Sequence, residues 1–305
     1  MNVAATRLAR VGTMRRPTFA QLAVASAAML VLIVATGATV RLTASGLGCQ
    51  HWPGCQPGDP LPAKGFHSYI EFGNRVVAFL TIVVTLAAWA AANLSRRVPP
   101  WLQALAGWVF IGTLGQAPLG AVTVYYHLNP YLVLSHLLLS FVVLALAVVV
   151  ALEALHLERG SGAAAPRPVL TAAAAALAAL CALVVSGTFV TASGPHPGSI
   201  DVRRLGYFEH AIWLHVRATA VFGLLFLGLI GWVVRERRRR PEAVRGAAHL
   251  LGLLLLQMAI GEIQYRTQLP WWLVLGHVSV AATVWAVAVG LAALLWRPFP
   301  PHRLR

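Results

Sequence analysis

Charged residues are scarce in this sequence of 305 residues, and their scarcity defines its class. Only 11% of the residues are charged, with nine Asp and Glu against 24 Lys and Arg, whereas 58% are hydrophobic. In a soluble domain, the long uncharged stretches of Leu, Val and Ala would be exposed to water, so a soluble globular protein is excluded. We therefore predict an integral membrane protein.

Eight stretches are long and apolar enough to cross a bilayer as helices, since about 20 apolar residues span its hydrocarbon layer. The predicted spans are residues 18–41, 70–93, 101–124, 130–153, 168–190, 209–234, 246–265 and 270–296. The basic start resembles a signal peptide, but the apolar run that follows is too long and more spans follow it. We expect an all-α fold of eight transmembrane helices with an uncleaved first helix.

The net charge of +15 is divided unevenly between the two sets of loops. One set holds 17 of the 24 basic residues, namely Arg7, Arg10, Arg15, Arg16, Arg96, Arg97, Arg159, Arg167, Arg235, Arg237, Arg238, Arg239, Arg240, Arg245, Arg297, Arg303 and Arg305. By the positive-inside rule this set faces the cytoplasm, which places both termini on the cytoplasmic side of the cell membrane. The run 237–240 suits anionic lipid head groups, and we expect no nucleic-acid partner.

Cysteine is also rare, with three residues in the chain. Cys49 and Cys55 lie in the first predicted outer loop, where a C-x5-C pair on the oxidising side favours a disulfide that closes a small loop. Two free thiols, thiol–disulfide exchange and transient metal binding are the alternatives. Cys181 lies inside the fifth predicted span, where we expect it to pack in the core.

Polar residues and glycines inside the spans recur at one spacing. Four pairs lie 141 positions apart: Asn74 and His215, Gln116 and Gln257, Gly120 and Gly261, and His136 and His277. The pattern predicts two tandem four-helix bundles, residues 1–157 and 169–305, joined by a cytoplasmic linker at 158–168. Because four spans return the chain to its starting side, we expect a pseudo-two-fold axis along the membrane normal.

Asn74, His136, His215 and His277 lie near the outer ends of the second, fourth, sixth and eighth predicted spans. Polar side chains inside a membrane usually face the bundle interior, and for one histidine alone an interhelical hydrogen bond is as plausible as a ligand role. His215 and His277 lie at similar depth, without the further ligands that zinc or copper usually recruits. Two facing imidazoles between helices suit a haem iron.

Haem propionates need cations near the outer face of the membrane. Arg41 and Arg217 are the propionate candidates, and Arg203, Arg204 and Arg266 also lie near that face. Simple interfacial anchoring is the alternative for each of these arginines.

The first bundle lacks the second histidine, because His136 is matched there with Asn74, a poor iron ligand. One axial position is then open, as a site that activates a substrate requires. Glu71 lies on the same helix face as Asn74 and has no acidic counterpart at Ile212. Its carboxylate could act as a general acid or base, or stabilise positive charge on a substrate carbon. The alternative is an i,i+4 ion pair with Arg75.

Over nearly its whole length, the chain resembles the haem A synthase family. The resemblance rests on "GATVRLTASGLGCQHWPGC" at 37–55, "IEFGNR" at 70–75, "QAPLGAVTV" at 116–124 with "LSH" ending at 136, "HVR" at 215–217, and "QMAIG" at 257–261 with "LGH" ending at 277. The family makes the haem of terminal oxidases by oxidising a ring methyl group of haem O to a formyl group. This resemblance therefore implies a membrane oxidoreductase that takes haem O as substrate and works by successive hydroxylation.

The resemblance also implies roles for particular residues. It implies a haem b whose iron is bound by His215 and His277, a role for Glu71 in the oxidation, and a Cys49–Cys55 pair. It places haem O in the first bundle. At that site we select His136 as the iron ligand, and Asn74 and Arg75 as further residues that bind the substrate haem. Many relatives have histidine where this chain has Asn74. Candidate protein partners are a haem O synthase and an electron acceptor.

Two rival functions account for part of the pattern. A non-catalytic b-type cytochrome that passes electrons from a quinol to a partner explains His215 and His277 but leaves Glu71 without a role. A parallel-repeat transporter, in which the histidines and Glu71 carry protons or a substrate, explains the repeat but not the matched depth of the histidines.

Overall fold

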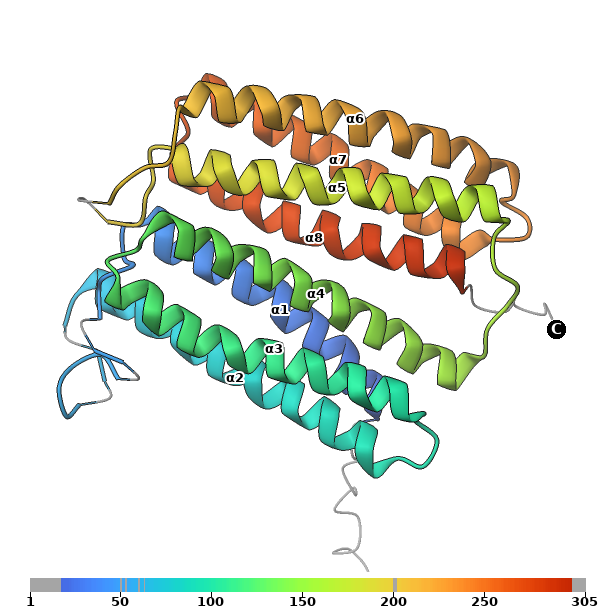
Figure 1. The fold of residues 1–305 in the computed structure, drawn as a ribbon, viewed down its shortest axis with the longest axis horizontal. Helices are drawn as coiled ribbons and strands as arrows, with labels where there is room; N and C mark the ends of the chain where they lie inside the picture. The colour runs from blue at the N-terminus through green and yellow to red at the C-terminus, as the bar shows by residue number, and fades with distance from the viewer. Residues whose placement is uncertain are drawn as a thin grey trace, which may run out of the picture.

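The computed structural model describes residues 18–297 except 50, 53, 60, 63, 200 and 201. That part of the chain forms eight long helices (Figure 1): α1 Phe19–Leu42, α2 Phe66–Leu94, α3 Pro100–Tyr125, α4 Pro130–Arg159, α5 Arg167–Ser193, α6 Phe208–Arg235, α7 Pro241–Arg266 and α8 Trp271–Trp296. Each is long and apolar enough to cross a membrane. The predicted all-helical membrane protein with eight spans is confirmed.

Several helices extend beyond the apolar windows from which they were predicted. Helix α2 begins at Phe66, four residues before its window, and α7 begins at Pro241, five residues before its window. An apolar window marks the stretch in contact with lipid, whereas helical hydrogen bonding continues until a cap or a proline ends it. At the start of α1, Thr18 and Gln21 each accept a hydrogen bond from the other's backbone amide, forming a capping box.

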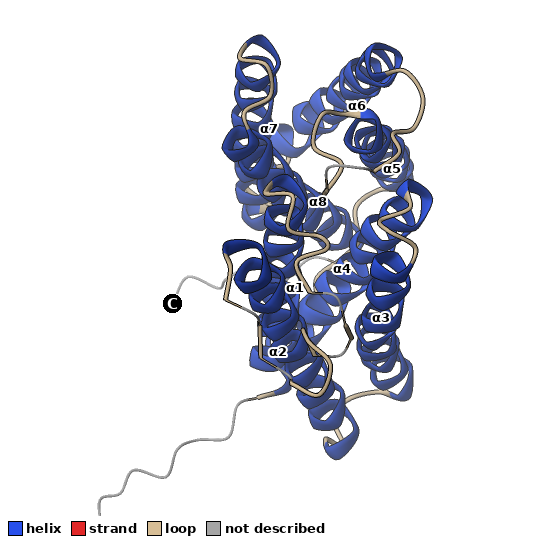
Figure 2. Ribbon diagram, turned by 90° about the vertical axis from the view of Figure 1, so that its left-hand side faces the viewer, coloured by secondary structure: helices blue, strands red, loops and turns tan. Residues whose placement is uncertain are grey.

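The helices pack as two neighbouring sets of four. In the first set α1 and α3 each pack against both α2 and α4, and in the second set α8 packs against α5 and α7 while α6 packs mainly against α5. The sets meet along α1, α4, α5 and α8, and they occupy the lower and upper parts of Figure 1. Figure 2 gives the same arrangement from the side. The predicted domain boundary and symmetry axis stay predictions.

One end of the molecule carries the loop with Cys49 and Cys55 and is called the disulfide end; the opposite, linker end carries residues 160–166. Side-chain hydrogen bonds join the two sets at both ends and between them: Arg41 to the carbonyl of Thr191, Trp285 to the carbonyl of Phe141, and Arg297 to Glu153. The two sets are therefore fixed to each other along their whole length.

The basic loops gather at the linker end, as the charge pattern predicts. The α2–α3 loop, the linker and the α6–α7 loop all lie there because successive helices alternate in direction. Arg240 donates hydrogen bonds to the carbonyls of Ala163 and Ala164, at 3.0 and 2.9 Å, which ties the α6–α7 loop to the linker. Six of the predicted cytoplasmic arginines lie outside the described residues: Arg7, Arg10, Arg15, Arg16, Arg303 and Arg305.

The expectation that Cys181 packs in the core was wrong. Its side chain is exposed on α5. A thiol is close to apolar, so a surface that faces lipid accepts it as readily as the protein interior does.

Trp285 offers a test of the contact between the two sets. Its indole nitrogen donates to the Phe141 carbonyl at 2.8 Å, and its ring meets the Phe141 ring edge to face, at 5.8 Å between centroids. We expect Trp285→Ala to lower the free energy of unfolding by about 3–5 kcal/mol, because it leaves a cavity at the interface. The control Trp296→Ala, at a side chain that is 67% exposed, should change it little. Equal unfolding curves of both variants in detergent would contradict this assignment.

Candidate functional site

His215 on α6 and His277 on α8 face each other inside the second set of helices. Helices α6 and α8 do not pack directly against each other over their described lengths, so the two rings meet across the interior. Their centroids are 6.4 Å apart and their planes are inclined by 65°. Two imidazoles that bind one metal ion from opposite sides, each through a nitrogen about 2 Å away, have centroids about 6 Å apart. The spacing therefore fits two axial ligands of one iron.

The contact between Ser186 and His215 favours one of the two tautomers of the ring. The Ser186 hydroxyl has a single proton; its oxygen lies 2.8 Å from the carbonyl of Leu183 and 3.0 Å from Nδ1 of His215. With that proton directed to the Leu183 carbonyl, the oxygen would accept a hydrogen bond from Nδ1–H. Nε2 of His215 then keeps its lone pair and is available to a metal.

Two glycines let the histidine rings lie close to the neighbouring helices. A Cβ atom at Gly187 on α5 would lie 3.0 Å from Cε1 of His215, and one at Gly261 on α7 would lie 3.2 Å from Cε1 of His277. A larger residue at either place would push the ring out of position. Gly261 belongs to the sequence repeat, and Gly37 on α1 lies beside Asn74, where a Cβ atom would be 3.9 Å from Oδ1.

The first set of helices repeats these contacts with one substitution. A Cβ atom at Gly120 on α3 would lie 3.7 Å from Cε1 of His136 on α4, matching Gly261 and His277. In the place of His215, Asn74 on α2 accepts a hydrogen bond from the Thr36 hydroxyl on α1, at 2.8 Å. Helices α2 and α4 likewise do not pack directly against each other. The spacing of 141 residues therefore corresponds to matching contacts in space.

Within the part of the chain that the structure describes, no three His, Cys, Asp or Glu side chains gather as they would around a zinc or copper ion. The candidate metal ligands instead come in pairs, each pair formed by residues on two helices that face each other across the interior of a bundle. That arrangement suits a haem.

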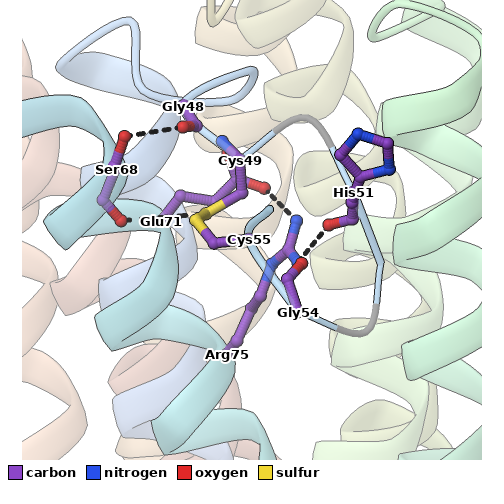
Figure 3. A network of polar contacts seen from close by, with 8 residues as sticks. All are labelled: Gly48, Cys49, His51, Gly54, Cys55, Ser68, Glu71 and Arg75. Carbon is purple, nitrogen blue, oxygen red and sulfur yellow. Dashed lines mark hydrogen bonds and ion pairs between the residues drawn. A yellow bond between two sulfur atoms is a disulfide. The ribbon is translucent and has the colours of Figure 1, made fainter. Parts of the chain in front are cut away.

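Glu71 is buried near the start of α2 and holds the loop that carries Cys49 and Cys55 (Figure 3). The Cys49 amide donates to its Oε2 at 2.8 Å, and Arg75 donates to its Oε1 at 2.6 Å. Arg75 also donates to the carbonyls of His51 and Gly54, at 2.7 and 2.5 Å. The i,i+4 ion pair considered as the alternative for Glu71 is therefore present, and it fastens the loop to α2.

The Cys49–Cys55 disulfide is formed, which confirms that interpretation over two free thiols. The loop lies tightly against α2: a Cβ atom at Gly48 would lie only 2.5 Å from the carbonyl of His67, and the Ser68 hydroxyl donates to the Gly48 carbonyl at 2.7 Å. Sequence reasoning missed Gly48 and Ser68, although a glycine beside a loop cysteine is a signal of close backbone approach.

The arginines named as propionate candidates lie in different surroundings. Arg41 and Arg203 line a cavity of about 20 Å³ between the two sets of helices, which is large enough for a water molecule. Arg217 lies over the ring of Trp213, 3.1 Å from its centroid, on an exposed part of α6. Arg266 pairs with the exposed Glu262, and Arg204 is exposed. A propionate role stays a prediction for each of them.

Comparison with known proteins gives a family and several relatives. Residues 20–65 and 60–196 match the family COX15-CtaA, described as "Cytochrome oxidase assembly protein". The chain is 33% identical over 149 residues to a protein of Geobacillus thermodenitrificans named "Heme A synthase", a match that covers 48% of this chain and 46% of that protein. A protein of the same name from Symbiobacterium thermophilum is 29% identical over 258 residues, covering 78% and 83% of the two chains.

A third relative has a different name. The "Protoheme IX farnesyltransferase" of Thermus thermophilus is 31% identical over 290 residues, covering 86% of this chain but 46% of that protein. The match with the Geobacillus protein likewise covers less than half of that relative. More than half of the Thermus protein therefore lies outside the region that resembles this chain.

The network around Glu71 predicts how well the disulfide is protected. Glu71→Gln removes one partner of a buried ion pair, a change that costs about 3–5 kcal/mol where the other charge stays buried. We expect the loop to open more often, so that dithiothreitol reduces the disulfide at least about tenfold faster, which corresponds to 1.4 kcal/mol. Alkylation of Cys49 and Cys55, followed by mass, measures the rate.

The matched control is Glu209→Gln, which removes an exposed acid in the first turn of α6. It should leave the reduction rate unchanged. Equal rates in the wild-type chain and both variants would show that the Glu71 network does not protect the loop.

Proposed function

We propose that this chain, which belongs to the COX15-CtaA family of cytochrome oxidase assembly proteins, is a haem A synthase that oxidises a ring methyl group of haem O to a formyl group for terminal oxidase assembly. The pair of histidines in the second set of helices, 6.4 Å apart between ring centroids, carries the proposal. The proposed reaction needs one site for the haem that is oxidised and one for a haem that takes up the electrons, which would account for two similar bundles in one chain. The relatives named "Heme A synthase" support the same activity.

The second set of helices is the proposed site of haem b. His215 and His277 would be the axial ligands, and the protonated Nδ1 of His215 leaves its Nε2 free to bind. Bound there, haem b supplies a one-electron carrier, as two histidine ligands favour. Gly187 and Gly261 hold the space in which the two rings stand.

The first set is the proposed site of haem O. His136 would be the ligand of the substrate iron, while Asn74, engaged by Thr36, leaves the opposite face without a strong ligand. With water as the source of oxygen, each of two oxidations replaces a C–H bond of the methyl group with a C–OH bond and releases two electrons and two protons, and the resulting gem-diol loses water to give the formyl group. The haem b site next to it is the proposed first acceptor of these electrons.

Glu71 is the proposed catalytic group. It lies one helical turn before Asn74 on α2, in a buried position, with its carboxylate oriented by the Cys49 amide and Arg75. A carboxylate fixed in this way can stabilise positive charge that develops on the methyl carbon or accept its proton. Arg75, already bonded to Glu71 and to the loop, would set the position of that carboxylate.

The proposed location is the cell membrane, with the linker end and both termini in the cytoplasm. The gathering of arginines at the linker end supports this orientation, as does a disulfide at the opposite end, which would face an oxidising compartment. Anionic lipids would contact Arg237–Arg240. A haem O synthase is a proposed partner, because the Thermus relative joins a region resembling this chain to a larger remainder and is named for farnesyl transfer to protohaem.

The haem b assignment predicts a difference between the histidines. We expect the purified protein to show a haem b spectrum that is lost in His215→Ala and in His277→Ala, because each variant removes an axial ligand. His136→Ala should retain the spectrum, since that residue lies in the other set of helices. A spectrum unchanged in the first two variants would remove the assignment.

Activity is tested by producing the chain together with a haem O synthase and identifying the extracted haems by mass. We expect haem A with the wild-type chain, and at least about 100-fold less with Glu71→Gln, the smallest loss typical of a missing general acid or base. Haem b should remain in this variant. A haem-loaded wild-type protein that yields haem O alone would indicate an electron carrier instead of an enzyme.

A second variant separates the chemistry of Glu71 from its hold on the loop. Cys49→Ser combined with Cys55→Ser loosens the same loop but keeps the carboxylate. If Glu71 acts on the substrate, this double variant should retain far more conversion than Glu71→Gln. An equal loss of haem O conversion in the two variants would indicate that Glu71 only holds the loop and does not act on the substrate.

A further inference from the structure

Each set of helices contains a glutamine that is bonded to the backbone of a candidate iron ligand. Gln116 Nε2 on α3 donates to the carbonyl of His136 at 3.3 Å, and Gln257 Nε2 on α7 donates to the carbonyl of His277 at 3.1 Å. A carbonyl accepts and never donates, so this contact fixes the orientation of each amide group. The side-chain oxygen is therefore the free end of both glutamines.

The free ends of these glutamines and the histidines beside them are unsatisfied in the same way. Oε1 of Gln116 and of Gln257, and Nδ1 of His136 and of His277, are buried and have no hydrogen-bond partner among the described residues. An unpaired buried polar group costs about 1–3 kcal/mol. In both sets the unpaired atoms are one acceptor and one nitrogen that can donate, which is a complementary pair.

His215 shows what such a nitrogen requires. In the tautomer that its contact with Ser186 favours, Nδ1–H is accepted by the Ser186 hydroxyl and Nε2 is left for the metal. An iron-binding histidine almost always donates its other N–H to an acceptor, which fixes both the tautomer and the orientation of the ring. His277 is the proposed partner ligand of His215, and the acceptor for its Nδ1–H is the one element of this arrangement still to be assigned.

We propose that the side-chain oxygen of Gln257 accepts the Nδ1–H of His277 when haem is bound, and that Gln116 does the same for His136. Each oxygen sits on the same carbon as a nitrogen that is already bonded to the backbone carbonyl of that histidine, which holds the amide group beside the residue whose ring it would contact. Gly120 and Gly261, one helical turn from the glutamines, lie against the same two rings: a Cβ atom there would lie 3.7 Å from Cε1 of His136 and 3.2 Å from Cε1 of His277. The inference rests on the proposed haem sites.

The role of Gln257 is to position His277 and to tune the iron. An acceptor at Nδ1 makes the imidazole a more basic ligand, which favours ferric over ferrous iron and lowers the reduction potential of haem b. Gln116 would act in the same way on the substrate haem through His136. The recurrence of glutamine at both positions follows from this requirement, since each bundle has one histidine whose Nδ1 lacks an acceptor.

Two variants of Gln257 test the proposal by redox titration of the purified haem protein. Gln257→Met and Gln257→Glu both remove the amide donor to the His277 carbonyl, but only Glu keeps an acceptor. We expect the midpoint potential to rise in the Met variant and to fall in the Glu variant. A tenfold change in the preference for ferric iron corresponds to a shift of 59 mV for one electron.

Ferric electron paramagnetic resonance separates a hydrogen bond from a charge that acts through space. A stronger acceptor gives the ligand imidazolate character and changes the g values, whereas a distant charge shifts the potential alone. The g values of the Glu variant should therefore move away from those of the wild type. The matched control is Gln116→Met, which should leave the haem b potential and g values unchanged because it lies in the other set of helices.

The outcomes distinguish this inference from the proposed function. A wild-type protein without haem b would overturn the haem site itself. Haem b with the same potential and g values in both Gln257 variants would overturn the role of the Gln257 side chain, and would leave the backbone carbonyl of Gln257, which also lies near the His277 ring, as the acceptor. Shifts of equal sign in both variants would indicate a general disturbance and also contradict the proposal. If the Met variant loses its haem, the g values of the Glu variant carry the test: a change from the wild type supports the proposal, and unchanged g values contradict it.

Discussion

Polar side chains inside this eight-helix protein have to find partners within the protein, because lipid offers none, and at the candidate sites those partners lie on neighbouring helices. The Thr36 hydroxyl engages Asn74, the Ser186 hydroxyl engages His215, and the two glutamines engage the backbones of His136 and His277. Each of these bonds joins two neighbouring helices and at the same time fixes a residue that points to the interior. The same hydrogen bonds therefore hold the helices together and position the candidate ligands, in both sets of helices.

The two halves share a set of matching contacts between helices and differ in the residue types at a few of the matched positions. His215 and Ile212 in the second half correspond to Asn74 and Glu71 in the first, so one half offers two imidazoles and the other offers one imidazole and an acid. The acid is not isolated, since it holds the disulfide loop through the Cys49 amide and Arg75. The carboxylate and the loop therefore hold each other in place through these two hydrogen bonds.

Sequence reasoning reached the parts of the structure that depend on composition and on recurrence. Eight spans follow from apolar length, and the spacing of 141 residues identified residues that make matching contacts. It did not reach contacts that depend on how each helix is rotated about its axis. Arg217 lies two residues from His215, yet it turns away from that ring and lies over Trp213 on an exposed part of α6. The protonation of His215 depends on a proton given by Ser186 to Leu183, which no pattern of residue types specifies.

The interface between the halves connects their two candidate sites. Helices α4 and α8 pack directly against each other, and they carry His136 and His277. Asn74 and His215 lie on α2 and α6, which take no part in that interface. The bond between Trp285 and the Phe141 carbonyl joins α4 to α8 within a few turns of both histidines. Electron transfer between two haems falls steeply with distance, so a rigid contact at this point is what a relay between the halves requires. The tandem arrangement accordingly puts His136 and His277, the proposed ligands of the substrate haem and of the electron carrier, on the two helices α4 and α8 that pack against each other, whereas Asn74 and His215 lie on the outer helices α2 and α6.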